Sequence, residues 1–192
     1  MKMVKVIQFF KNESSLIKRA SAGNRDAQQR IYELHSPKML SVCRQYIKDL
    51  HHAEDTMLNG FFKVFTHLKD FREEGSFEGW IRKIMVRESI SFLRQHEKLE
   101  FQEDLGHESP EVLNNIISEM NVADIQALID TLPEGYKMVF VLYAVEGYKH
   151  AEIAKMLEIS EGTSKSQLFK ARKMLQEKLK TNNSSAYGTS QI

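Results

Sequence analysis

The chain has 192 residues, of which 42% are hydrophobic and 28% are charged, so it carries enough apolar side chains for one or two small cores. Its longest apolar run, residues 138–145, is far shorter than the about 20 residues of a membrane-spanning helix, and no signal-peptide pattern opens the sequence. These features exclude the membrane and secreted classes, and we expect a globular, cytoplasmic protein.

Proline and glycine are scarce, with three and nine residues, which permits long helices and argues against a turn-rich β fold. The single cysteine, Cys43, forms neither an internal disulfide nor a cysteine-based zinc site, and its apolar neighbours indicate burial in a helix. Apolar residues recur every three or four positions in segments near 12–21, 25–48, 51–70, 77–97, 122–130, 134–146, 149–157 and 161–180. The sequence therefore predicts an all-α fold.

The net charge of +1 conceals segments of opposite sign. Residues 97–119 hold seven acids and one base, whereas residues 162–180 hold six bases and one acid. The helical pattern also weakens between 98 and 121, where Gly106 and Pro110 occur. We predict two small helical domains, 1–97 and 122–180, joined by a flexible acidic linker at 98–121 and followed by a disordered polar tail at 181–192.

The segment 51–70 begins with acids and continues with a dense apolar set made up of Leu58, Phe61, Phe62, Phe65 and Leu68. This stripe is wider than one buried face requires, so part of it is a candidate partner surface. The alternative is that every phenylalanine lies in the core and that Glu54 and Asp55 only favour the helix N-terminus. His51 and Asp55 have the spacing of metal ligands, but two ligands are too few for a site and no catalytic constellation accompanies them. We expect no metal, no cofactor and no enzymatic chemistry.

The helix predicted at 77–97 has a core side and a basic side. One is an apolar stripe of Ile81, Ile84, Met85 and Phe92, and the other is a basic face of Lys83, Arg87, Ser91, Arg94 and Lys98. Phe77 and Trp80 lie near its start, where an aromatic surface beside positive charge suits an unpaired DNA base. Core packing is the equally weighted alternative for Trp80.

Residues 148–180 have the spacing of a helix-turn-helix, with a short helix, a turn of three or four residues and a longer helix. The inner face of the first helix holds Ile153, Ala154 and Leu157, and that of the second holds Ser164, Leu168, Ala171, Leu175 and Leu179. The opposite side of the second helix carries Thr163, Ser166, Gln167, Lys170 and Lys173. These residue types suit the DNA major groove, whereas an isolated basic helix is often only a solvated face.

Three blocks in this order resemble the extracytoplasmic-function (ECF) class of bacterial sigma factors, the promoter-recognition subunits of RNA polymerase. The blocks are AEDTMLNGFFKVFTHLKDF at 53–71, SFEGWIRKIMVRESISFLR at 76–94 and LPEGYKMVFVLYAVEGYKHAEIAKMLEISEGTSKSQLFKARKML at 132–175. The resemblance covers about residues 15–180 and implies a region 2 domain and a region 4 domain. Region 2 would bind the clamp of the largest polymerase subunit and open the minus-10 element, and region 4 would read the minus-35 element and touch the flap.

The resemblance also implies roles for residues by position. Polymerase binding falls to Glu54, Asp55, Leu58, Phe61 and Phe62. Contact with the minus-10 strand falls to Phe77, Trp80, Lys83, Arg87 and Arg94. Contact with the minus-35 duplex falls to Thr163, Lys165, Ser166, Gln167, Lys170 and Lys173. An anti-sigma factor is a further implied partner, and Lys149 replaces the serine that usually caps the helix beginning there.

A stand-alone helix-turn-helix regulator, with an N-terminal domain that senses a ligand or dimerises, is the alternative function. It explains the C-terminal domain equally well, but it gives no reason for a second basic helix that carries Trp80. Co-elution with core RNA polymerase separates the two hypotheses.

Overall fold

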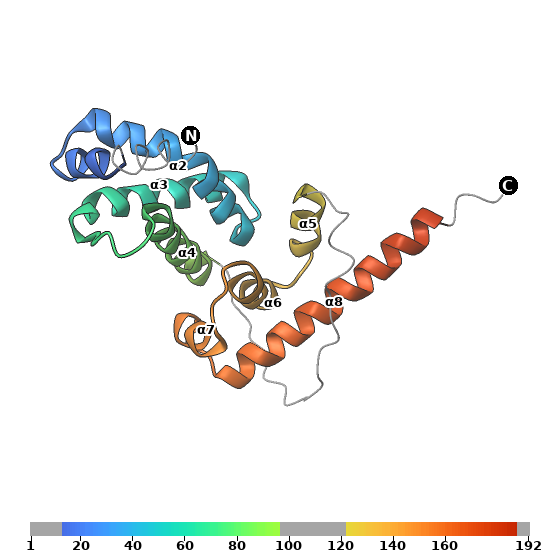
Figure 1. The fold of residues 1–192 in the computed structure, drawn as a ribbon. Coiled ribbons are helices and arrows are strands. Elements are labelled where there is room, and N and C mark those ends of the chain that lie inside the picture. The colour runs from blue at the N-terminus through green and yellow to red at the C-terminus, as the bar shows by residue number, and fades with distance from the viewer. Residues whose placement is uncertain (1–12, 97–121, 188–192) are drawn as a thin grey trace, which may run out of the picture. The chain divides into compact units, whose positions relative to one another are not determined.

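The structure is a computed structural model that describes residues 13–96 and 122–187, and all the regular elements in these ranges are helices (Figure 1). The chain divides into two compact units, Met1–His96 and Glu97–Ile192. The predicted linker at 98–121 lies outside the described residues. No helix in the described ranges combines the length and the apolar composition that a membrane crossing requires.

Unit 1 is a packed set of helices whose starts are fixed by side-chain caps. A helix at 13–21 precedes α2 (Arg25–Tyr46), α3 (Leu50–Thr66), the short 3-10 helix η1 (Leu68–Asp70) and α4 (Phe77–His96). Asn24 accepts a hydrogen bond from the backbone N–H of Ala27, and Asp49 accepts one from that of His52. Such N-caps satisfy backbone donors that have no partner within the helix. The helices α2, α3 and α4 all pack against one another (Figure 1).

The core of unit 1 draws on all three long helices, and its residues include Ile31, Met39, Cys43, Tyr46, Ala53, Met57, Phe61, Val64, Ile81, Met85, Ile90 and Leu93. The predicted burial of Cys43 is confirmed. The predicted apolar stripe of α4 is partly wrong, because Ile84 and Phe92 are only half-buried while Val86, Ile90 and Leu93 are buried. Contact with both α2 and α3 turns a wider arc of α4 inward than a single neighbour would.

Unit 2 contains α5 (Val122–Ile129), α6 (Glu134–Phe140), the π-helix η3 (Val141–Val145), α7 (His150–Leu157) and α8 (Glu161–Tyr187). The long helix α8 packs against α6 and α7 (Figure 1). The predicted inner faces are confirmed, since Ile153 and Leu157 are buried on α7 and the set Ser164, Leu168, Ala171, Leu175 and Leu179 is buried on α8. Ala154 is half-buried.

The turn between α7 and α8 is held by local hydrogen bonds. The carboxylate of Glu152 accepts a hydrogen bond of 2.8 Å from the backbone N–H of Lys149, so half of a capping box survives without the usual serine. Glu158 ends α7 in the left-handed conformation, with φ of 57°. Ser160 then caps α8 by accepting a 2.9 Å hydrogen bond from the N–H of Thr163. These contacts fix the angle at which α8 leaves the turn.

The helix α8 extends through Tyr187, whereas the polar tail was predicted to begin at residue 181. Residues 181–187 contain no glycine or proline, and the first helix-breaking residue, Gly188, comes after the helix end. Residues 188–192 lie outside the described part of the chain.

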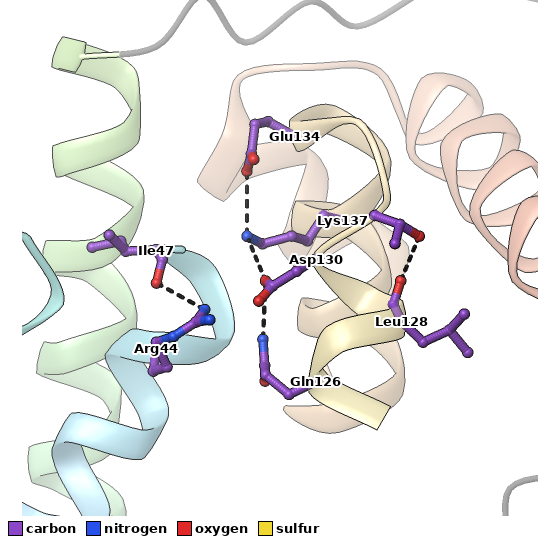
Figure 2. A network of polar contacts seen from close by, with 8 residues as sticks. Arg44, Ile47, Gln126, Leu128, Asp130, Glu134 and Lys137 are labelled. Atoms are coloured by element: carbon purple, nitrogen blue, oxygen red, sulfur yellow. Dashed lines mark hydrogen bonds and ion pairs between the residues drawn. The ribbon is translucent and has the colours of Figure 1, made fainter. Parts of the chain in front are cut away.

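A polar network stabilises the junction of α5 and α6 (Figure 2). The ammonium group of Lys137 is almost completely buried and lies 3.4 Å from Asp130 Oδ1 and 3.5 Å from Glu134 Oε2. Gln126 donates a further hydrogen bond of 3.1 Å to Asp130 (Figure 2). Burying a charge is costly unless it is paired, so the two carboxylates make the inward position of Lys137 possible.

Candidate nucleic-acid interface

The first half of α8 exposes positive charge. Lys165 and Lys173 are exposed, and Lys170 and Ser166 are half-buried. We call Lys165, Lys170 and Lys173 the recognition-helix surface. Lysine ammonium groups bind DNA phosphates and guanine acceptors, so this surface has the chemistry of a major-groove reader.

The structure corrects the assignment of Gln167 and Thr163 to the DNA-facing side. Gln167 is fully buried, because α8 packs against α6 as well as α7 and the inward arc extends beyond the predicted core stripe. Thr163 is 6% exposed, and its hydroxyl forms a 2.8 Å hydrogen bond with the Ser160 hydroxyl. The Ser166 hydroxyl donates to the carbonyl of Thr163 at 3.0 Å. Of the predicted set, Lys165 and Lys173 are therefore the exposed members.

His150 connects the two helices of the helix-turn-helix. Its Nδ1 lies 2.9 Å from the Ser164 Oγ of α8, and its ring stacks on Tyr143 with the ring centres 4.6 Å apart. The guanidinium of Arg172 lies over the same tyrosine ring at 5.6 Å. Burial lowers the pKa of His150, with the neighbouring Lys165 and Arg172 acting in the same direction and Glu161 opposing them. The sequence pattern missed this cluster because its members come from three separate elements.

A second basic surface lies on α4. Lys83, Arg87 and Arg94 are exposed on this helix, as predicted, and Ser91 is half-buried. Lys98 lies outside the described residues. We call Lys83, Arg87 and Arg94 the α4 basic face.

The two aromatic residues at the start of α4 differ in burial. Phe77 is 2% exposed and packs edge-on against His35, with ring centres 5.6 Å apart, so it belongs to the core and the expected contact with DNA is corrected. Trp80 is half-buried and stacks on Phe77 at 5.9 Å, while its ring also lies 5.5 Å from that of Phe71. The buried Phe77 ring thus supports the Trp80 ring from the core side.

A cavity of about 400 Å³ opens between η1 and the start of α4. Its lining combines an aromatic ring, charged groups and a glycine-containing loop, namely Asp70, Phe71, Arg72, Glu74, Gly75, Ser76, Gly79, Trp80 and Lys83. We call it the loop pocket. Sequence reasoning found Trp80 and Lys83 but missed the loop residues, because helical periodicity carries no information about a loop.

The outer side of α3 exposes large apolar side chains. Phe62 is 72% exposed and Leu58 is 50% exposed, and we call these two residues the α3 patch. Nearer the start of the same helix, Asp55 is exposed and Glu54 is half-buried. Phe61 is 2% exposed and packs against Tyr32 at 4.9 Å, so its assignment to a partner surface is corrected. These two side chains, four residues apart on one helix, are the exposed part of the candidate partner surface.

The described residues offer no ligand set for the metal site considered at His51 and Asp55. No group of three or more histidine, cysteine, aspartate or glutamate side chains there is arranged to hold an ion. The His51 ring instead lies 3.8 Å from a Glu54 carboxylate oxygen.

Comparison with protein families finds two matches in chain order. Residues 31–99 match the family described as Sigma-70 region 2, and residues 123–175 match Sigma-70, region 4. Together these matches cover more than half of the chain. The first match falls almost entirely in unit 1 and the second falls in unit 2, and together they contain the surfaces described above.

Curated relatives match over most of the chain. The ECF RNA polymerase sigma factor SigW of Bacillus subtilis is 25% identical over 177 residues, which are 85% of this chain and 95% of SigW. The ECF RNA polymerase sigma-E factor of Haemophilus influenzae is 23% identical over 180 residues, covering 87% of this chain and 95% of that protein. The ECF sigma factor SigE of Mycolicibacterium smegmatis is 26% identical over 151 residues, which are 76% of this chain and 58% of SigE.

Two solved structures share the fold. The sigma factor RpoE from Bartonella quintana, solved with the anti-sigma factor NepR, aligns with a TM-score of 0.51 and 20% identity over 79% of this chain and 96% of RpoE. CnrH, solved in complex with the cytosolic domain of CnrY, aligns with a TM-score of 0.50 and 19% identity over 86% of this chain and 96% of CnrH.

Proposed function

The chain belongs to the ECF class of the sigma-70 family, and from this premise we propose that it binds core RNA polymerase and directs it to promoters. The observation that carries the proposal is the occurrence of both family regions, in order, on two compact units that each expose basic side chains on a helix. A single DNA-reading unit would need only one such surface.

Unit 2 reads the upstream duplex in this proposal. The recognition-helix surface enters the major groove of the minus-35 element, where Lys165, Lys170 and Lys173 reach phosphates or guanine edges. His150 and the Ser160 cap hold α8 at the angle that this docking requires.

Unit 1 holds the opened minus-10 strand. The α4 basic face follows the phosphates, and an unpaired base enters the loop pocket against Trp80. A stacked base gains about 1–3 kcal/mol from an aromatic platform, which favours the separated strands over the duplex. Phe77 contributes by holding Trp80 in place from the core.

The α3 patch, together with Glu54 and Asp55, is the proposed contact with the polymerase clamp. Burial of Leu58 and Phe62 would remove two large exposed apolar side chains of α3 from water. We also infer that an anti-sigma factor regulates the protein, as the RpoE–NepR complex suggests by analogy. Unit 2, which reads the minus-35 element in this proposal, would also contact the polymerase flap.

The proposed activity is binding without chemistry of its own. The polymerase forms the phosphodiester bond, and this subunit contributes duplex recognition and strand separation, so we infer a non-enzymatic protein that works in the cytoplasm with polymerase. The stand-alone regulator is not favoured, because a region 2 match on the N-terminal unit has no place in it.

Size-exclusion chromatography with core RNA polymerase tests the proposal. The wild-type chain is expected to co-elute with the core enzyme, and the double variant Leu58→Ser/Phe62→Ser is expected to lose this association while keeping its helical circular dichroism. A matched control is Leu34→Ser, which changes another exposed leucine, on α2. A wild-type dimer that ignores polymerase would instead support the stand-alone regulator.

A further inference from the structure

The loop pocket is shaped by a loop of six residues, 71–76, between η1 and α4. Every loop residue except Glu73 lines the cavity. Glu73 has φ of 58°, the left-handed conformation that residues with a side chain rarely adopt. The loop therefore holds an unfavourable backbone conformation at the one position whose side chain does not line the cavity.

A contact from outside the loop accompanies this conformation. The Ser14 hydroxyl, 59 positions earlier in the chain, donates a 2.9 Å hydrogen bond to the Glu73 Oε1. Ser14 lies on the helix at 13–21, which is outside the residues that match the region 2 family. The hydrogen bond thus ties the loop to a helix that the family match does not include.

The start of this N-terminal helix also lies close to the first turn of α4. Glu78 of α4 forms an ion pair with Lys38 of α2, and burial, followed by repulsion from Glu78, raises the pKa of Glu13. Two contacts therefore hold the loop. Glu73 is hydrogen-bonded to Ser14 of the N-terminal helix. At the other end, Ser76 caps α4 by accepting a 3.0 Å hydrogen bond from the backbone N–H of Gly79.

We propose that Ser14 is a positioning residue that holds the loop pocket in the shape that selects the unpaired minus-10 base. This inference rests on the proposed function of the loop pocket. Without the hydrogen bond, Glu73 relaxes from its left-handed conformation, and its chain neighbours Arg72 and Glu74, which both line the pocket, move with it. The pocket then discriminates less well between bases, although Ser14 itself does not line it.

The experiment measures how holoenzyme, formed from the full chain and core polymerase, discriminates among forked promoter DNAs. The probes carry each of the four bases at each unpaired position of the minus-10 strand. For Ser14→Ala we expect the ratio of affinities between the preferred and the other bases to fall by about two- to tenfold, the range expected for one net hydrogen bond. Ser14→Thr retains a hydroxyl and is expected to keep the wild-type ratio.

Ser15→Ala is the matched control, because Ser15 is the exposed neighbour of Ser14 on the same helix and takes no part in the Ser14–Glu73 hydrogen bond. It is expected to discriminate like the wild type. Glu73→Ala is expected to reproduce the loss, and the double variant Ser14→Ala/Glu73→Ala to lose no more than either single variant. Unchanged discrimination in Ser14→Ala, or losses that add in the double variant, would overturn the inference.

Trp80→Ala separates this inference from the function on which it rests. If Trp80→Ala leaves forked-DNA binding unchanged, the loop pocket does not hold a base and the proposed function of the pocket fails. If Trp80→Ala weakens binding while Ser14→Ala keeps the wild-type base ratio, only the positioning role of Ser14 is contradicted. Thermal unfolding of each variant shows whether a loss comes from unfolding of unit 1 instead.

Discussion

At the scale of single residues, His150 shows how one side chain links the geometry of the helix-turn-helix to its stability. Its hydrogen bond to Ser164 joins α7 to α8, and its ring packs on Tyr143 of η3. A protonated ring would add a third positive charge to those of Lys165 and Arg172, and Glu161 compensates only in part. Folding therefore favours the neutral form of the His150 ring.

The lowered pKa of His150 predicts a pH-dependent stability of unit 2. Below its ordinary pKa of 6.5, the unfolded chain binds a proton that the folded chain resists, so the free energy of unfolding decreases as the pH falls. The decrease ends once the pH lies below the folded-state pKa. Hydrogen exchange of α7 and α8 amides, corrected for the intrinsic rate, should show faster opening at acidic pH in the wild type. In His150→Gln the dependence should be weaker, and an identical dependence in both proteins would contradict the assignment.

Trp80 and Phe77 should respond differently to truncation. Trp80 lines the loop pocket, whereas Phe77 is buried in the core and stacks on Trp80. Trp80→Ala is expected to reduce the permanganate reactivity of the opened minus-10 strand strongly. The affinity for the unopened promoter duplex is expected to fall less. Phe77→Ala should instead lower the stability of unit 1 by about 3–5 kcal/mol, the usual cost of emptying a buried phenylalanine site. Normal permanganate footprints with Trp80→Ala would argue against base stacking on this residue.

Lys173 and Gln167 form a similar pair on α8. Lys173→Ala should weaken minus-35 duplex binding and reduce the slope of log affinity against log salt by about one, as for the loss of one phosphate contact. Gln167→Ala should leave that slope unchanged and lower the melting temperature of unit 2, since Gln167 is fully buried. A reduced slope for Gln167→Ala would show that this residue reaches the DNA after all.

The exposed site residues were predictable from the sequence, whereas several buried ones were not. The α4 basic face, Lys170 and Lys173 were identified from helical spacing and charge, whereas Lys165 was assigned from the family resemblance. Gln167, Phe77 and Phe61 were misplaced because a helical wheel gives a residue's angle but not the number of neighbouring helices that cover it. The Glu73 contact was missed because its partner Ser14 is distant in sequence, and the loop pocket was missed because helical periodicity carries no information about a loop.

At the scale of elements, the crossing of α3 and α4 depends on a glycine. Gly60 is buried on α3, and a Cβ added there would overlap the Sδ of Met85 and lie 2.9 Å from its Cε. Met85 is itself fully buried, so its side chain has little room to move away. The two helices approach closely because position 60 has no side chain.

Gly60→Ala is therefore expected to destabilise unit 1, although alanine is the better helix former. Overpacking costs about 1–3 kcal/mol, and the gain in helix propensity of about 1 kcal/mol offsets part of it. Gly162→Ala is the control, because a Cβ there meets only Ser160 Oγ, at an ordinary 3.5 Å. Chemical denaturation followed by Trp80 fluorescence measures the effect of Gly60→Ala on unit 1, and circular dichroism follows Gly162→Ala in unit 2. Equal or greater stability of Gly60→Ala would contradict this view of the crossing.

Periodicity located the helices closely but not their irregular ends. The helix predicted at 51–70 is α3 followed by η1, because the last turn tightens into a 3-10 helix at Leu68. The π-helix η3 falls within the continuous apolar run at 138–145, where side-chain pattern does not distinguish bonding to the fourth residue from bonding to the fifth. Helix existence follows from local sequence, whereas the termini depend on individual hydrogen bonds.

At the scale of the whole molecule, a net charge near zero is divided between basic surfaces on both units and the acidic stretch at 97–119. The two basic surfaces would bind different stretches of one promoter, one as duplex and one as separated strand. Because the two units are joined in one chain, binding of one raises the local concentration of the other at its own element. The account thus predicts that promoter recognition needs two sequence blocks at a restricted spacing.

The most direct test of this central claim is run-off transcription by core RNA polymerase, reconstituted with the protein, from a promoter library with a randomised upstream region. The transcribed templates should be enriched in two short blocks, one near minus-35 and one near minus-10, separated by a narrow range of lengths. Lys170→Ala/Lys173→Ala should relax selection only in the upstream block, and Trp80→Ala only in the downstream block. Absence of transcription above that of core polymerase alone, or enrichment of a single block unaffected by Trp80→Ala, would contradict the account.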